Sequence, residues 1–269
     1  MTTLLGACST FPVLPLVERE EAPVPVDLLL GYSVEKRPLR VRILAQGEKS
    51  VLVLGAMHGD EEGSRQLVED WARELLARPD ALEGLGLALV SVVNPDGLSR
   101  GQRGNARGVD LNRNFPADNF RPARSRGYRP FSEPESRFVR RTLELVRPVL
   151  VIAVHQPRRS VNYDGPARGI AEAMASCNGY RLEQDVGYPT PGSLGSWLGK
   201  DLGIPIVTLE LPPRPAQGRS FFSENRTALE KALGLARGMP PRDPAGSAGG
   251  EFSPTMGVSP TRQARRFVR

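Results

Sequence analysis

Short apolar runs alternate with amphipathic stretches along most of the chain, and the apolar runs predict buried strands. Four runs rich in valine, leucine and isoleucine are bounded by turn residues and cover 50–56, 85–93, 149–154 and 205–211. A further strand is expected over 39–45, before the turn at Gln46–Glu48. Strands that are apolar throughout are typical of a parallel sheet that is covered on both faces.

The stretches between these runs predict helices. In 61–77 the apolar residues recur at spacings of three and four: Leu67, Val68, Trp71, Leu75 and Leu76. Ser132, which acidic residues follow, is expected to be the N-cap of a helix that ends near Val146. Helices are also expected over 170–178 and 223–237. The alternation of strands and helices predicts an α/β fold with a largely parallel sheet.

Composition divides the chain into three parts. Residues 1–29 contain a Pro-rich stretch without clear periodicity and are expected to form a loosely attached leader. Residues 30–237 carry the predicted elements and form one domain, which includes an Arg- and Gly-rich loop over 98–130. A loop of this length is usually functional or disordered. Residues 238–269 are rich in Pro, Gly, Ser and Arg, which is typical of a disordered tail.

The leader contains a possible lipid attachment site. Leu5–Cys8 is similar to a bacterial lipobox, which would make the protein a lipoprotein or place it in the periplasm. The preceding stretch is very short and has neither a basic residue nor an apolar region, so we interpret the match as chance. No apolar run approaches the roughly 18 residues that a bilayer requires, and no stable membrane span is expected.

The net charge of +6 permits an anionic partner but does not require one. The arginines are scattered and lack the aromatic interleaving of nucleic-acid-binding surfaces, which favours a solvated surface and no nucleic-acid partner. The two cysteines, Cys8 and Cys177, are too few for a disulfide framework, as in proteins of a reducing compartment. The oligomeric state stays open.

The only two histidines, His58 and His155, both fall at the ends of predicted strands. Open sheets of this kind bind ligands beyond the carboxyl ends of their strands, so the two imidazoles are expected to meet there. Glu61 follows His58 by three residues and adds a carboxylate. Two imidazoles and a carboxylate suit zinc and leave a fourth position open, as in catalytic sites. Asp60 and Glu62 are alternatives to Glu61.

A lone acid in an apolar strand indicates a candidate general base. Glu210 lies within 207–211, where an unpaired carboxylate would be costly to bury unless it has a purpose or a partner. A peptidase needs a group that takes a proton and passes it to the leaving amine. Glu210 suits this task, and a structural salt bridge is the alternative.

Arginines in the long loop indicate anion recognition. Arg113 follows Asn112, and arginine binds carboxylates through two parallel hydrogen bonds. A second arginine near the metal would stabilise the oxyanion of a tetrahedral intermediate. A solvated Arg-rich loop is the alternative. The turn-rich segment 187–197 is either a pocket wall or flap, or only a connector.

Taken in order, these segments resemble the zinc carboxypeptidase family over about residues 31–237. The similar pieces are His58–Glu61, Asn94–Gly97, Arg103–Asn105, Gly108–Phe115, His155 and Thr208–Leu211. The resemblance implies a mixed, mostly parallel sheet of about eight strands between helices. It implies that one Zn²⁺ ion is held by three ligands: His58, Glu61 and His155. It also implies that Glu210 is the base, that Arg103 stabilises the oxyanion, and that Asn112 and Arg113 bind the substrate's terminal carboxylate. Tyr188 lies near the position of the family's flap tyrosine.

Within the family, 31–39, 188–197 and the short route from Asn94 to Arg113 are most similar to the murein tripeptide amidases. Those enzymes act in the cytoplasm on the γ-D-glutamyl–diaminopimelate bond of small peptides recovered from cell wall. The resemblance thus implies murein tripeptide as substrate. The leader and the tail depart from these compact enzymes, which leaves the location and any partner open.

Three other functions compete with this interpretation. A general carboxypeptidase would use the same zinc chemistry on ordinary peptides. A deacylase of the succinylglutamate desuccinylase or aspartoacylase type shares the zinc motif and an Asp-Leu-Asn-Arg stretch, but 94–97 and 192–197 favour the peptidase branch. A non-catalytic binding protein would lack a ligand or the base, whereas all four positions are filled here.

Overall fold

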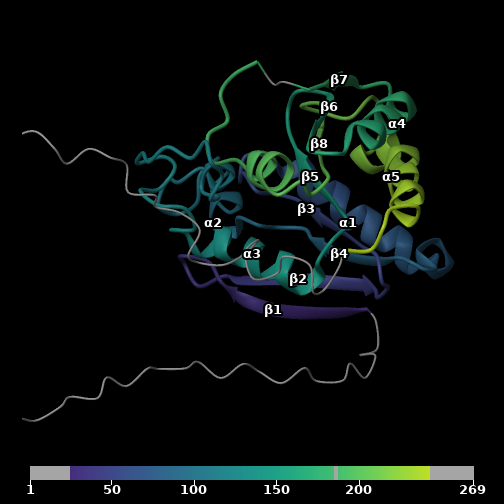
Figure 1. Ribbon diagram of the computed structural model, residues 1–269, viewed down its shortest axis with the longest axis horizontal. Coiled ribbons are helices and arrows are strands. Elements are labelled where there is room, and N and C mark those ends of the chain that lie inside the picture. Colours follow the sequence, from purple (N-terminus) through teal and green to yellow (C-terminus); the bar gives the residue numbers. More distant parts are fainter. Residues whose placement is uncertain (1–24, 185–186, 243–269) are drawn as a thin grey trace, which may run out of the picture.

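One mixed eight-stranded sheet organises the protein, with the strand order β1-β2-β4-β3-β5-β8-β6-β7. The computed structural model describes residues 25–184 and 187–242. The strands are β1 (Val26–Tyr32), β2 (Pro38–Ala45), β3 (Ser50–Leu54), β4 (Gly86–Val90), β5 (Leu150–His155), β6 (Ser160–Asp164), β7 (Arg181–Glu183) and β8 (Ile206–Glu210). In Figure 1 they succeed one another from β1 at the bottom to β7 at the top.

The centre of the sheet is parallel, because β4, β3, β5 and β8 pair in one direction. Antiparallel pairs flank this centre: β2 joins β4 and β1 on one side, and β6 joins β8 on the other. The short strand β7 pairs with β6 in parallel. The prediction of a mixed, mostly parallel sheet of about eight strands between helices is thus confirmed.

Helices cover both faces of the sheet. They are α1 (Glu62–Leu76), α2 (Pro95–Leu98), α3 (Pro134–Val146), α4 (Arg168–Asn178) and α5 (Phe221–Arg237), with the 3₁₀ turns η1 (Pro79–Leu82) and η2 (Leu111–Arg113) and the π-helical segment η3 (Ser196–Asp201). Residues of α1, α4 and α5 share one core with one face of the sheet, and residues of α3 and η3 share a second core with the other. Among the described helices, none is both long and apolar enough to cross a membrane.

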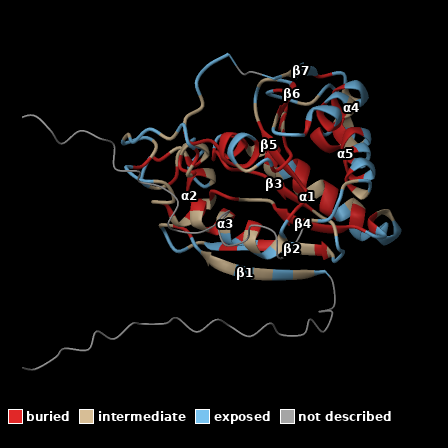
Figure 2. Ribbon diagram, viewed as in Figure 1, coloured by how far each residue is buried: buried red, intermediate tan, exposed pale blue. Residues whose placement is uncertain are grey.

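Successive residues of the central strands belong in turn to one core and to the other. In β5, Ile152 and Val154 join the core beneath α1, α4 and α5, while Val151 and Ala153 join the core beneath α3. Successive side chains of a strand point to opposite faces, so a strand that is buried on both faces must be apolar throughout. Figure 2 shows this burial as a continuous red centre. The apolar runs seen in the sequence are therefore the centre of the sheet.

Two expectations at element ends differ from the structure. β1 begins at Val26, so the expected domain boundary at residue 30 lies inside a strand that pairs with β2. The helix N-cap is Glu133 rather than Ser132, because Pro134 occupies the first helical turn. Ser132 instead accepts a hydrogen bond from Asn114 Nδ2 over 2.9 Å. Cys8, the rest of the leader through residue 24, and the tail from residue 243 lie outside the described residues.

Packing of aromatic side chains holds the long loop 98–130 in place. Phe115 is fully buried and stacks on Trp197, with ring centres 5.8 Å apart and an interplanar angle of 8°. Phe131 meets Trp197 edge-on, with ring centres 5.3 Å apart. Asn112 and Arg113 directly precede Phe115 in the same loop. The aromatic cluster therefore holds this part of the loop against the sheet, beside the predicted site.

Replacing Phe115 by alanine is expected to lower the free energy of unfolding by about 3–5 kcal/mol, because it removes a fully buried ring from this cluster. Urea unfolding followed by circular dichroism measures the change. The control is Tyr128→Ala, because 76% of Tyr128 is exposed and a change within about 0.5 kcal/mol is expected there. A similar small loss in both variants would mean that the loop does not depend on the cluster.

Candidate active site

The turn between β3 and α1 carries two of the predicted metal ligands. A Cβ added to Gly59 would lie 2.0 Å from the carbonyl carbon of Gly97, so only glycine permits this close approach of two backbones. Ala56 has a left-handed φ of 43° and starts the turn. As a result, the side chains of His58 and Glu61 turn inward, and the two residues are 2% and 4% exposed.

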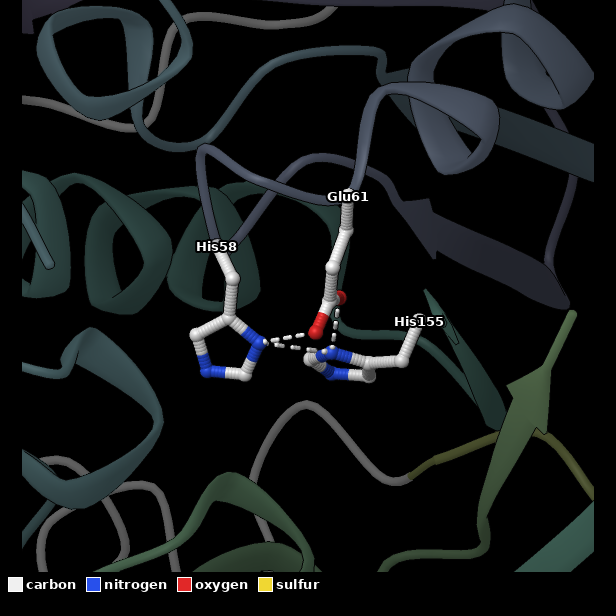
Figure 3. A group of neighbouring side chains, drawn as sticks. All are labelled: His58, Glu61 and His155. Carbon is white, nitrogen blue, oxygen red and sulfur yellow. Dashed lines mark hydrogen bonds and ion pairs between the residues drawn. The ribbon is translucent and has the colours of Figure 1, made fainter. Parts of the chain in front are cut away.

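Three donor atoms converge at the carboxyl ends of β3 and β5. His58 Nδ1 lies 2.7 Å from Glu61 Oε1, and His155 Nδ1 lies 2.8 Å from Glu61 Oε2. The two Nδ1 atoms are 3.2 Å apart. Figure 3 shows the three side chains pointing toward one another, two from the turn before α1 and one from β5. The buried group of two imidazole nitrogens and a carboxylate fits a single metal ion of the zinc type.

The neighbouring acids point elsewhere. Asp60 is exposed, and Glu62 accepts a hydrogen bond from Arg65 Nε over 2.9 Å at the surface of α1. Of the three adjacent carboxylates, Glu61 alone faces the two histidines.

Asp110 contacts the ring nitrogen of His58 that faces away from Glu61. The sequence alone did not indicate this role. Asp110 Oδ1 lies 3.0 Å from His58 Nε2, and its Oδ2 accepts a hydrogen bond from Arg103 Nε over 3.1 Å. A carboxylate on the outer ring nitrogen of a ligating histidine holds the imidazole's orientation and leaves the other nitrogen for the metal. Asp110 lies within the Asp-Leu-Asn-Arg stretch, which is the signal that pointed to this loop.

The charges in this group are strongly coupled. Burial by itself would lower the pKa of His58, but hydrogen bonds to Asp110 and Glu61 outweigh it and raise the pKa to about 9. Burial would likewise raise the pKa of Glu61, but the charges of the two histidines and their hydrogen bonds lower it to about 2. The pKa of Asp110 is lowered against its burial by His58 and Arg103. Without a metal, a proton on His58 therefore balances the surrounding carboxylates.

Glu210 ends β8 directly beside His155, because the two residues are partners in the parallel register. Its Oε2 is buried and has no hydrogen-bond partner, and burial raises the pKa of the carboxyl group. Among the described residues no cation forms an ion pair with it, which differs from the structural salt bridge considered above. A buried carboxylate with one oxygen left without a partner, beside a group that suits a metal, is the arrangement expected of a base.

Hydrogen bonds to the backbone position the other polar residues beside the metal group. Asn94 caps α2 by accepting a hydrogen bond from Gly97 N, and its Nδ2 donates to the carbonyl oxygen of Arg103 over 3.3 Å. Asn112 Oδ1 accepts from the backbone N of Leu194 over 2.9 Å, and this contact fixes the side chain of Asn112 beside the cavity that it lines. Arg113 Nη1 donates to the carbonyl oxygen of Asn112 over 2.6 Å.

All of the predicted site residues line one cavity of about 1170 Å³: His58, Glu61, Arg103, Asn112, Arg113, His155, Tyr188 and Glu210. Tyr188 is 48% exposed, and the guanidinium carbon of Arg158 lies 5.8 Å from the centre of its ring. The cavity also has charged residues that sequence reasoning did not assign, among them Arg158, Asp164 and Lys200.

Known proteins resemble this chain over most of its length. The zinc carboxypeptidase family model matches residues 20–169. Murein peptide amidase A of Escherichia coli K12 is 34% identical over 190 residues, which are 63% of this chain and 74% of that protein. The crystal structure of murein-tripeptide amidase from Escherichia coli O157 is 29% identical, with a TM-score of 0.63 over 83% of this chain and 96% of that one. Carboxypeptidase A from Helicoverpa armigera shares the fold, with a TM-score of 0.71 at 18% identity, over 81% of this chain and 70% of that one.

Metal affinity is expected to rise about tenfold per pH unit between pH 7 and 8.5, because the metal must displace the proton from His58, whose pKa is about 9. Glu61 stays ionised throughout, since its pKa is about 2, and adds nothing to the slope. Competition with a chelator of known pH dependence measures the affinity. Calorimetry in buffers of different ionisation enthalpy should detect about one released proton.

The matched variant is Asp110→Asn, which removes a carboxylate that holds the proton on His58. Its pH dependence is expected to be flatter. Equal slopes in both proteins, or an affinity independent of pH, would contradict this account of the group.

Proposed function

The chain belongs to the zinc carboxypeptidase family, and we propose that it cleaves the γ-D-glutamyl–diaminopimelate bond of murein tripeptide. At the coarser level, family and relatives identify it as a metal-dependent hydrolase of amide or peptide bonds. The observation that carries the finer proposal is the single cavity in which a metal-binding group, a buried carboxylate and several cations meet.

In this proposal His58, Glu61 and His155 hold one zinc ion, which when bound polarises the substrate carbonyl and acidifies water. Glu210 takes a proton from the attacking water and then gives it to the leaving amine nitrogen. Burial raises the pKa of this carboxyl group, which makes Glu210 a better acceptor of the proton from water.

The cations act on the charges of the substrate. Arg103 forms an ion pair with the metal group, with Nη1 3.4 Å from Glu61 Oε1, and it would stabilise the oxyanion as the carbonyl is attacked. Asn112 and Arg113 would bind the carboxylate of the leaving residue. Tyr188 would close over the bound peptide from the segment 187–197.

The charge of the cavity favours an acidic peptide. Five cationic side chains line its described part: Arg103, Arg113, Arg121, Arg158 and Lys200. In L-Ala-γ-D-Glu-diaminopimelate the γ linkage leaves the α-carboxylate of glutamate free, and diaminopimelate adds two more carboxylates. An ordinary peptide needs only one carboxylate at its C-terminus to be bound. We therefore propose murein tripeptide as substrate and cell-wall recycling in the cytoplasm as the setting.

Glu210→Gln is expected to lower kcat by about 10²–10⁴-fold, because the amide cannot take the proton. Zinc content should stay stoichiometric, since Glu210 is not among the three converging donors. The control is Glu48→Gln. Glu48 is exposed and does not line the cavity, so kcat is expected to stay unchanged. Near-normal turnover in Glu210→Gln would exclude Glu210 as the base.

The substrate is tested by competition on zinc-loaded protein. L-Ala-γ-D-Glu-meso-diaminopimelate competes with α-linked peptides that have varied C-termini, and a tripeptide amidated on the α-carboxylate of its leaving residue tests the need for that group. Release of diaminopimelate from the free tripeptide alone would support the proposal. Cleavage of the α-linked peptides with the tripeptide intact would identify a general carboxypeptidase, and cleavage of N-acyl amino acids alone a deacylase.

A further inference from the structure

We infer that Asp164 and Lys200 recognise the amino-acid group at the far end of the leaving residue, Asp164 its ammonium and Lys200 its carboxylate. This inference rests on the proposed function and names what selects the leaving residue. Both residues line the same cavity as Glu210, and the sequence analysis assigned a function to neither.

The pairing of β6 with β8 determines where Asp164 lies. The strands are antiparallel, with Ser160 opposite Glu210, Asn162 opposite Thr208 and Asp164 opposite Ile206. Alternate residues of a strand share a face, so Asp164 follows Asn162 on the face that carries Glu210. Four residues of strand put it about 13 Å from the base. A leaving residue therefore needs a long side chain to reach from the base toward Asp164.

Two glycines clear the space for this carboxylate. A Cβ added to Gly195 would lie 2.2 Å from Asp164 Oδ2, and one added to Gly199 would lie 2.4 Å from Asp164 Cβ. Side chains at either position would displace Asp164. Gly195 itself lines the cavity, so its missing side chain also leaves the carboxylate accessible to a ligand.

Lys200 supplies the opposite charge beside Asp164. Its Nζ lies 3.3 Å from Asp164 Oδ1, and its side chain is 59% exposed, whereas that of Asp164 is 15% exposed. An ion pair with one such exposed partner contributes little stability, and it opens readily. A zwitterion then fits both sides at once, because its ammonium replaces Lys200 on Asp164 and its carboxylate binds the released Nζ.

The pair therefore predicts a preference that neither charge alone would produce. The second amino-acid group of diaminopimelate satisfies both residues. A lysine side chain satisfies Asp164 but leaves Lys200 without its partner, and a side chain that ends in a carboxylate alone does the reverse. Polar sites discriminate strongly against analogues that leave one of their groups unpaired.

The test uses the zinc-loaded enzyme and four substrates of the form L-Ala-γ-D-Glu-X. X is meso-diaminopimelate, lysine, 2-aminopimelate or norleucine, so that both, one or neither of the distal charges is present. The wild-type protein should prefer diaminopimelate over each singly charged residue by about tenfold or more in kcat/KM.

Two charge-removing variants divide the effect. Asp164→Asn should lower kcat/KM by about 10- to 100-fold for the diaminopimelate and lysine substrates and leave 2-aminopimelate unaffected. Lys200→Gln should lower it for diaminopimelate and 2-aminopimelate and leave lysine unaffected. In both variants the rate on norleucine should fall far less than the rate on the substrates whose charge the lost group binds, which shows that fold and chemistry are intact. The exposed controls Asp80→Asn and Lys231→Gln should change none of the four rates.

The outcomes separate this inference from the proposed function. A wild-type protein that cleaves none of the four substrates overturns both. Cleavage of all four at similar rates, or an equal loss on all four in the two variants, overturns the inference while the γ-D-glutamyl specificity stands.

Discussion

The parallel pairing of β3, β5 and β8 brings the candidate metal ligands and Glu210 together. Because the three strands run in one direction, the turn after β3, the end of β5 and the end of β8 meet at one edge of the sheet. His155 and Glu210 are register partners there, and the turn at His58 brings Glu61 to them. A slip of one residue in the β5–β8 register would turn one of these side chains into an apolar core.

The same edge gathers charges that would be costly to bury one at a time. Glu61, His58, Asp110 and Arg103 form a chain of alternating sign, and each shifts the pKa of its neighbours toward the charged form. Glu210 stands outside that chain: its Oε2 is buried without a hydrogen-bond partner, and burial outweighs the charges of the nearby histidines and raises the pKa of its carboxyl group. The site thus divides into a charged group that suits a cation and a separate buried carboxyl group whose pKa is raised by its burial, as binding and proton transfer respectively require.

Much of the site could be located from the sequence, because apolar runs mark central strands and polar residues at their ends are few. His58, His155 and Glu210 each end such a run. The edge of the sheet was harder to predict. β6 has polar residues on the face that lines the cavity and therefore lacks an apolar run, and β7 is only three residues long, so neither was expected. Asp164 was therefore not predicted as a site residue. Asp110 was not predicted either, because its contact with His58 joins residues 52 positions apart in the sequence.

The carboxylate of Asp110 touches both His58 and Arg103, and this sharing has a consequence for how the site responds to its ligands. A cation held by His58 and an anion held by Arg103 both act on one negative charge. Their binding free energies must then be coupled, and the coupling is the same in both directions. An anionic product that stays beside Arg103 would alter the retention of the metal by the factor with which the metal alters the retention of that product.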